Sequence, residues 1–171
     1  MSYLVTGGAG FIGSNLVKRL LTKNKRVLVL DSFIMGNLIS FNHPNLLVIK
    51  SDISNYKQFH NIMLNQNFVE RFDSIYHLAA NSDILKGLKN INIDFKNTFK
   101  STFNTIKIAR KFNIHNFYFA SSSAIYGDLG TNIKEDTGPL MPISNYGAMK
   151  LASEALISSA YENFLKNIVI F

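Results

Sequence analysis

The sequence predicts an α/β fold in which a doubly wound, open parallel sheet lies between two layers of helices. Apolar strand-like segments alternate with amphipathic helical segments along the whole chain, which is the pattern of successive βαβ units. Residues 27–30 are apolar without a break, as expected of a strand buried on both faces. With right-handed crossovers we expect a three-layer α/β/α arrangement and strand order 3-2-1-4-5-6.

The expected elements follow in order from these patterns. A strand at residues 4–6 precedes an amphipathic helix over about 12–21, and further strands are expected at 27–30, 46–49, 74–78, 116–120 and 167–171. Ser54 is the expected N-cap of a helix reaching about residue 64, and a last helix spans about 145–164. A long helix ends near Asn113 and carries Phe95, Phe99, Thr102, Phe103, Ile106 and Ala109 on one face. The phenylalanines of this face could serve a dimer interface or the core equally.

Length and composition limit the class of protein. A chain of 171 residues that is 47% hydrophobic and 17% charged is expected to form one globular domain. It has no cysteine, which excludes disulfides, cysteine-based zinc sites and thiol nucleophiles and fits our expected cytoplasmic location. The first motif begins almost at Met1, so we expect no signal peptide, and no apolar run is long enough to predict a membrane partner.

The formal charge is +7, from 18 Lys and Arg against 11 Asp and Glu. Nucleic-acid binding would call for cations gathered in one stripe, but here they are scattered along the chain. We therefore expect no nucleic-acid partner. A solvated basic surface that also favours anionic ligands is the simpler interpretation.

Three glycines follow the first strand at the spacing of a phosphate-binding turn. Gly7 permits the tight bend, Gly10 lets a pyrophosphate approach the backbone, and Gly13 lets the helix pack close to the strand. The helix that opens there offers unpaired N–H groups and a partial positive charge to the phosphates. This strand–turn–helix context predicts a dinucleotide site in a Rossmann fold.

Two aspartates extend this site. Asp31 ends the second strand, eighteen residues beyond Gly13, where a carboxylate accepts hydrogen bonds from adenosine ribose and repels a 2′-phosphate. This favours NAD over NADP as the cofactor. Asp52 and Ile53 follow the third strand and offer adenine a polar contact and an apolar wall.

A second group of residues can carry acid–base chemistry. Tyr146 and Lys150 lie at i and i+4 on one helix face, where an ammonium would favour the phenolate and make the tyrosine a general base. The serines at 121–123 follow the fifth strand; a hydroxyl there could bind a substrate alcohol, or the serines could simply cap a turn. The four histidines show no metal-ligand spacing, so we expect no metal, and His77 is expected to be a buried or hydrogen-bonded strand residue.

Taken together, these motifs resemble the extended short-chain dehydrogenase/reductase family, especially its nucleotide-sugar epimerases. The resemblance covers the whole chain and depends on TGGAGFIG at 6–13, Asp31, Asp52 with Ile53, HLAA at 77–80, SSSAIYG at 121–127 and YGAMK at 146–150. It implies Ser122 as the catalytic hydroxyl, with Ser123 a second choice, Tyr146 as the base, and Lys150 as the group that tunes it. The cofactor contacts that it implies are Phe11, Ile12, Asp31, Ser32, Asn37, Asp52, Ile53, Leu78, Ala79, Ala80, Tyr146, Lys150 and either Asn97 or Thr98.

The activity implied by the resemblance is NAD-dependent epimerisation of a nucleotide sugar, most simply at C4 of a UDP-hexose. Tyr146 would take a proton from a sugar hydroxyl during a transient hydride transfer to NAD. The alternatives are a dehydratase or reductase of similar substrates, or an NAD-binding module without turnover. Ser123 and Ala124 stand where the related dehydratases carry an Asp-Glu pair, which argues against dehydration.

Members of that family also carry a smaller substrate-binding domain after the sixth strand. We expect residues 1–171 to form the NAD-binding domain alone, with the substrate-binding domain absent from this chain, whether through natural truncation or because the chain is a fragment. The resemblance also implies a homodimer formed through a four-helix bundle of the long helix and the Tyr146 helix.

Overall fold

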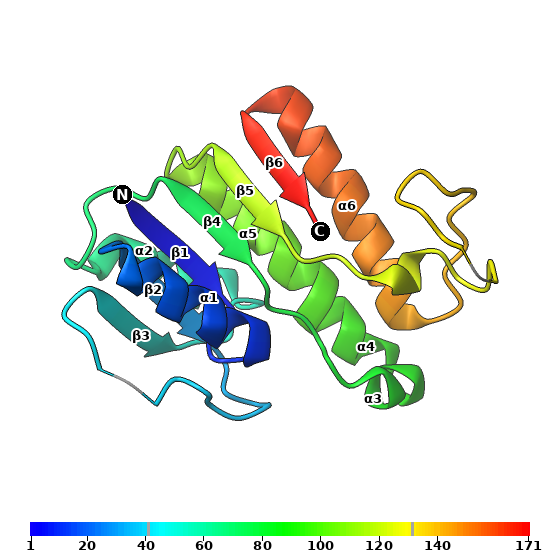
Figure 1. Ribbon diagram of the computed structural model, residues 1–171, viewed down its shortest axis with the longest axis horizontal. Helices are drawn as coiled ribbons and strands as arrows, with labels where there is room; N and C mark the ends of the chain where they lie inside the picture. Colours follow the sequence, from blue (N-terminus) through cyan, green and yellow to red (C-terminus); the bar gives the residue numbers. More distant parts are fainter. Residues whose placement is uncertain (41, 131) are drawn as a thin grey trace.

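A computed structural model describes residues 1–40, 42–130 and 132–171 of the chain. Six parallel strands form one sheet in the order β3-β2-β1-β4-β5-β6, which confirms the predicted topology (Figure 1). The first three strands are β1 (Ser2–Thr6), β2 (Arg26–Asp31) and β3 (Leu46–Lys50). The other three are β4 (Ser74–His77), β5 (Asn116–Phe119) and β6 (Asn167–Ile170).

The helical segments join these strands. They are α1 (Phe11–Thr22), α2 (Tyr56–Asn65), α3 (Ile84–Lys89), α4 (Ile91–Asp94), the π-helix η1 (Phe95–Lys100), α5 (Ser101–Lys111), the 3₁₀-helix η2 (Ser123–Ile125) and α6 (Asn145–Asn163). The N-cap of α2 is Asn55, whose side chain accepts a hydrogen bond from Gln58 N, and not Ser54 as predicted. The Ser54 hydroxyl instead donates to Asp52 Oδ1 at 2.6 Å, so it serves the preceding turn.

The predicted long helix is interrupted by η1, and its predicted apolar face is only partly buried. Phe95 and Phe103 are 45% and 43% exposed, whereas Thr98 and Thr102 are fully buried. The wider turn of η1 shifts the register between α4 and α5, so one apolar stripe does not keep facing the sheet. The buried side is polar because His77, on β4, lies 2.9 Å from Thr102 Oγ1 and needs a hydrogen-bonding partner there.

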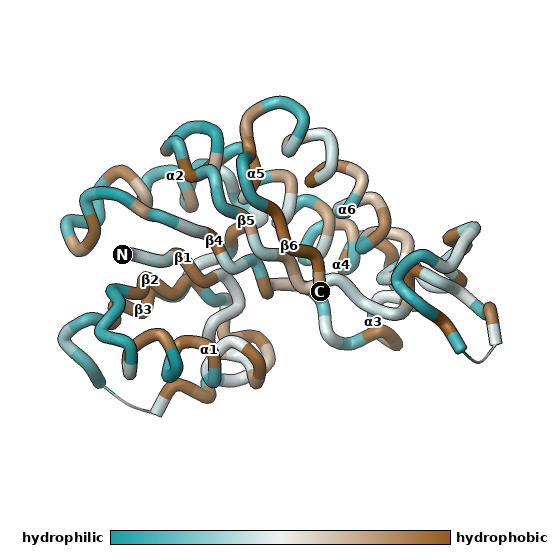
Figure 2. The backbone as a smooth tube through the Cα atoms, turned by 45° about the horizontal axis from the view of Figure 1, so that its top comes forward, coloured by the Kyte–Doolittle hydropathy of each residue, from teal (hydrophilic) through white to brown (hydrophobic). Residues whose placement is uncertain are grey.

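The two faces of the sheet are covered differently. One face packs against α2, α5 and α6 around a core that includes Phe59, Phe117 and Phe119 (Figure 1). The other face packs α1 over β1 and β2, where buried valines of the two strands meet Val17. In Figure 2 the tube is brown along β2, as expected for a strand that is buried on both sides.

Beyond α1, the same face of the sheet stays partly open. The rings of Tyr76 and Tyr118 stack there at 4.6 Å between centroids, and Val169 of β6, the register partner of Tyr118, is 46% exposed. Within the described ranges, the chain contains no helix that is both long and apolar enough to cross a membrane.

Candidate functional site

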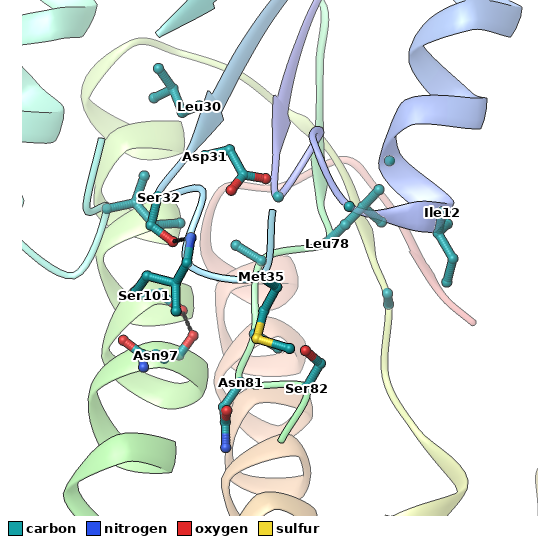
Figure 3. Close-up of a pocket in the computed structure, with 18 of the residues that line it drawn as sticks. Ile12, Leu30, Asp31, Ser32, Met35, Leu78, Asn81, Ser82, Asn97 and Ser101 are labelled. Atoms are coloured by element: carbon teal, nitrogen blue, oxygen red, sulfur yellow. Dashed lines mark hydrogen bonds between the residues drawn. The ribbon is translucent and has the colours of Figure 1, made fainter. Parts of the chain in front are cut away.

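A cavity of about 470 Å³ opens at the carboxyl ends of the strands (Figure 3). It lies where β1 is flanked by β2 on one side and β4 on the other, so the chain leaves the sheet in opposite directions. Open parallel sheets bind ligands at such a point. The predicted cofactor residues that line it are Gly7, Gly10, Phe11, Ile12, Gly13, Asp31, Ser32, Asp52, Ile53, Leu78, Ala79, Ala80 and Asn97.

The glycine turn closes the cavity beside α1. Gly7 has a φ of +70°, and a Cβ there would lie 2.6 Å from Ala79 N. A Cβ on Gly13 would collide with the Gly7 carbonyl, whereas one on Gly10 would meet nothing closer than that same oxygen at 3.5 Å. The fold itself therefore requires Gly7 and Gly13. Gly10 leaves open backbone that a pyrophosphate can approach, so the cradle fits a dinucleotide.

Asp31 holds this turn from the end of β2. Its Oδ2 accepts a hydrogen bond from Ala9 N at 2.9 Å and its Oδ1 accepts one from Phe33 N at 2.8 Å. The carboxylate is therefore already oriented at the edge of the cavity by two backbone N–H groups (Figure 3). Asn37, a predicted cofactor contact, is not among the lining residues; its Oδ1 accepts a hydrogen bond from Ile39 N at 3.0 Å within its own loop.

Asp52 is charged and already partnered. Its Oδ2 lies 2.8 Å from Lys96 Nζ, and its Oδ1 accepts hydrogen bonds from the backbone and side chain of Ser54. Burial raises the pKa of Asp52, but the hydrogen bonds from Lys96 and Ser54 outweigh it and hold the pKa below its usual value. The adenine contact that the sequence predicts would therefore share this carboxylate with Lys96.

Asn97 and Thr98 occupy different positions on η1. Asn97 lines the cavity, and its carbonyl accepts a hydrogen bond from Ser101 Oγ at 2.7 Å (Figure 3). Thr98 is fully buried, and its Oγ1 accepts from Asn81 N at 3.1 Å. Asn97 therefore faces the site, while Thr98 fixes the segment that follows β4.

Lys150 lies on α6, at the other end of the candidate site. Lys150, Tyr146 and Ser122 are not among the residues that line the cavity, whereas Ala120, which Lys150 contacts, is. This helix begins under an N-cap, Ser144, whose Oγ accepts from Gly147 N at 3.0 Å. Only 2% of Lys150 is exposed; its Nζ donates to Ala120 O at 2.5 Å and lies 4.5 Å from the centre of the Phe119 ring. Burial lowers the pKa of Lys150 to about 8.

Tyr146 lies one turn before Lys150, but its pKa does not move in the direction that the sequence predicts. Burial raises the pKa of the Tyr146 phenol, a hydrogen bond with Ser122 lowers it, and the charge of Asp94 raises it. Lys150 Nζ lies over the Tyr146 ring, 5.7 Å from its centre, and donates a hydrogen bond to Ala120 O. The net effect is an upward shift, so the phenol keeps its proton at neutral pH.

The three serines after β5 have different neighbours. Ser121 Oγ donates to Glu154 Oε1 of α6. Ser122 interacts with the Tyr146 phenol, and its Oγ also accepts from Ala124 N at 3.2 Å. Ser123 is exposed at the start of η2. Of the two serines considered from sequence, Ser122 is therefore the one brought to Tyr146.

His77 connects the two ends of the site. Its Nδ1 lies 2.6 Å from Thr6 Oγ1, its Nε2 lies 2.9 Å from Thr102 Oγ1, and its ring stacks on Phe119. Thr102 Oγ1 already donates to Thr98 O, so Nε2 donates to Thr102, and Nδ1 accepts from Thr6. Burial, with the nearby charge of Lys150, lowers the pKa of His77 to about 3. The prediction of a buried, hydrogen-bonded histidine is confirmed.

Sequence reasoning missed several residues of the cavity wall. Asn81 and Ser82 directly follow the predicted Ala79 and Ala80, so extending that segment by two positions would have found them. The loop after Asp31 carries no periodic signal, and its residues reach the cavity only through the folded turn. The lining residues missed from sequence are Leu30, Ile34, Met35, Gly36, Leu38, Ser51, Ser54, Asn81, Ser82, Ser101 and Ala120.

Comparisons with known proteins agree with this geometry. The model of the NAD dependent epimerase/dehydratase family matches residues 3–171. A UDP-glucose 4-epimerase of Lacticaseibacillus casei is 33% identical over 158 residues, which cover 92% of this chain and 46% of that protein. The chain spans about half the length of the curated relatives that it matches.

Solved structures give the same picture. The Thermus thermophilus UDP-glucose 4-epimerase in complex with NAD is similar with a TM-score of 0.88 at 28% identity, over 99% of this chain and 54% of that one. The UDP-Glc/GlcNAc 4-epimerase of Campylobacter jejuni is similar with a TM-score of 0.85 at 29% identity, over 99% and 52%. With a family match over nearly its whole length and the same fold around the cavity, the chain belongs to the NAD dependent epimerase/dehydratase family.

Proposed function

We propose that this chain is the NAD-binding and catalytic part of a nucleotide-sugar epimerase that acts at C4 of a UDP-hexose. The observation that carries the proposal is a single arrangement: a glycine cradle and a preoriented Asp31 at one end of the strand ends, and Ser122, Tyr146 and Lys150 at the other. The relatives and similar structures named as UDP-glucose 4-epimerases support the substrate class.

In this proposal NAD lies across the carboxyl ends of β1 and β4. Asp31 and Ser32 would bind the adenosine ribose, Asp52 and Ile53 would hold adenine, and Gly10 and the N-terminus of α1 would receive the pyrophosphate. Ala79, Ala80 and Asn97 would line the path towards the nicotinamide ribose. The Asp31 carboxylate would exclude a 2′-phosphate and so select NAD over NADP.

Bound NAD would supply a hydride acceptor and a positive ring beside Tyr146. The Tyr146 phenol would hold and move the proton of the sugar hydroxyl, and Ser122 would orient that hydroxyl through its contact with the phenol. Because burial raises the pKa of Tyr146, the tyrosine needs added positive charge to work as a base near neutral pH. Lys150 would hold the nicotinamide ribose and supply part of that charge.

We also propose that residues 1–171 form one NAD-binding domain and that a separate region grips the nucleotide of the substrate. The relatives are about twice as long as this chain, and the open sheet face at Tyr76, Tyr118 and Val169 suits a covering segment. A homodimer through α5 and α6 is part of the proposal, because Phe95, Phe103 and other apolar side chains beside these helices are exposed. Light scattering measures that state.

The deciding experiment measures cofactor and turnover separately. We expect NAD(H) to copurify with the chain, detected by absorbance and fluorescence, and the complete enzyme to interconvert UDP-glucose and UDP-galactose. Bound NAD without interconversion would leave a binding module, while a 4-keto product would indicate a dehydratase. A folded chain that binds no NAD would overturn the proposal.

A further inference from the structure

One carboxylate on α6 has no role in the proposed chemistry but lies on the catalytic face of the helix. Glu154 follows Tyr146 and Lys150 by two turns and one turn, so all three side chains point towards the segment after β5. That segment is contacted residue by residue: Lys150 binds Ala120 O, Glu154 binds Ser121 Oγ, and Tyr146 meets Ser122. Three successive turns of α6 therefore hold three successive residues.

We propose that Glu154, through its hydrogen bond with Ser121, is a positioning residue that holds the segment after β5 on α6 and favours the charged form of Lys150. Glu154 is half-buried, and its contact with Ser121 fixes the residues on either side of that serine. Ala120 O and the Ser122 hydroxyl are the groups that Lys150 and Tyr146 use. The link to catalysis rests on the proposed function, but the effect on Lys150 does not.

The charges around Lys150 support this role. Burial lowers the pKa of Lys150, and the Glu154 carboxylate raises it again. The other titratable groups that face this pair in the described chain are His77 on β4, which is neutral near pH 7, and Tyr146 on α6, which is neutral there too. Asp94 on α4 acts on Tyr146. Glu154 is thus the group that counters the desolvation of the ammonium.

The test titrates Lys150 in the 171-residue chain without cofactor, by NMR of ¹³Cε-labelled lysine, with Lys150→Met to assign the signal. Glu154→Gln retains a hydrogen-bond acceptor for Ser121 but removes the charge, and we expect the pKa of Lys150 to fall by about half a unit or more. Glu162→Gln removes the same charge from an exposed position on the same helix and should leave the titration unchanged. Equal titrations in the two variants would overturn the proposal.

A second pair of variants separates the hydrogen bond from the charge. Ser121→Ala and Glu154→Asp each retain the carboxylate but lose the contact, so the titration of Lys150 should stay close to wild type while NAD⁺ binds roughly threefold to tenfold more weakly. If Glu154→Gln does not fold, these two variants still decide, because unchanged NAD⁺ affinity in both contradicts the positioning role. Failure of the wild-type chain to bind NAD⁺ would overturn the proposed function and leave the titration result standing.

Discussion

The candidate site has two ends that are built by different means: the cavity with its glycine turn, and the group of Ser122, Tyr146 and Lys150 outside the cavity lining. At the glycine end, the groups that would meet a ligand are backbone N–H groups and one aspartate, and the turn is held by Asp31 of β2 and packs against Ala79. At the Tyr146 end, a lysine that is 2% exposed meets a carbonyl thirty residues away, and a serine from the segment after β5 meets a tyrosine from α6. One end uses conformation, and the other uses buried charge.

The two ends are therefore expected to be sensitive to different changes: substitution at the glycine end, and pH at the Lys150 end. The glycine turn contains no titratable group, so its contribution to stability does not vary with pH. It is disrupted when a side chain is placed in it. A buried ammonium costs folding free energy because desolvation disfavours its charge, and that cost varies with pH. The chain therefore keeps a destabilising group at the Lys150 end of the candidate site, a feature that is common at functional sites.

The largest effect concerns His77, which joins the two ends. Its pKa is about 3 in the folded chain against an ordinary 6.5, so the unfolded chain binds the extra proton between these values. Stability is therefore expected to fall as pH drops from about 6.5 towards 3, by roughly 5 kcal/mol at most. His77→Gln should flatten this acid limb in urea unfolding at a series of pH values, whereas partly exposed His60→Gln should keep it. An acid limb that survives His77→Gln would remove His77 as its cause.

Lys150 is expected to act on the alkaline side. Its pKa falls from an ordinary 10.5 to about 8, so between these values the unfolded chain binds more protons and stability rises with pH. The rise amounts to about 3 kcal/mol at full extent. Between pH 8 and 9.5 the Lys150→Met variant should lose this slope, measured by denaturant unfolding against wild type. A slope equal in both proteins would show that desolvation of Lys150 carries no such cost.

At the glycine end, two substitutions of the same kind should behave differently. Gly13→Ala places a Cβ against the Gly7 carbonyl and should cost about 1–3 kcal/mol of stability, as overpacking does. Gly10→Ala meets only ordinary contacts, so it should leave the thermal midpoint near wild type and weaken NAD⁺ binding alone. Thermal unfolding and calorimetric titration measure the two effects. If both variants lose stability equally, the fold does not distinguish the two positions.

The smallest effect is expected at Asp31. Asp31→Asn leaves one oxygen to serve the two backbone N–H groups of Ala9 and Phe33, and it removes the charge that would repel a 2′-phosphate. NAD⁺ affinity should fall about tenfold, equivalent to about 1.4 kcal/mol, while the preference for NAD⁺ over NADP⁺ should shrink. Competitive titration with the two cofactors measures this. An unchanged preference would contradict the role of the carboxylate in selection.

Much of the local architecture could be predicted from residue patterns. The strand order follows from alternating apolar segments and right-handed crossovers, and the glycine turn follows from a spacing that only a tight strand-to-helix bend needs. The position of Asp31 at the edge of the cofactor site could be predicted because it ends the second predicted strand, eighteen residues beyond Gly13. The glycine turn and Asp31 lie within the first βαβ unit, so a short stretch of sequence is enough to predict them, whereas the strand order follows from the general crossover rule.

The order of the strands, the glycine turn and the residue types at the Tyr146 end of the candidate site could all be predicted from the sequence. The folded structure was needed to show that η1 interrupts the long helix and that Asn97, not Thr98, lines the cavity. It also shows that the Asn37 side chain accepts a hydrogen bond within its own loop. The upward shift in the pKa of Tyr146 could likewise not be predicted from the spacing of Tyr146 and Lys150, because it depends on burial and on Asp94. The burial of a residue and the charges around it depend on segments that are distant in sequence, so residue spacing along one helix cannot predict them.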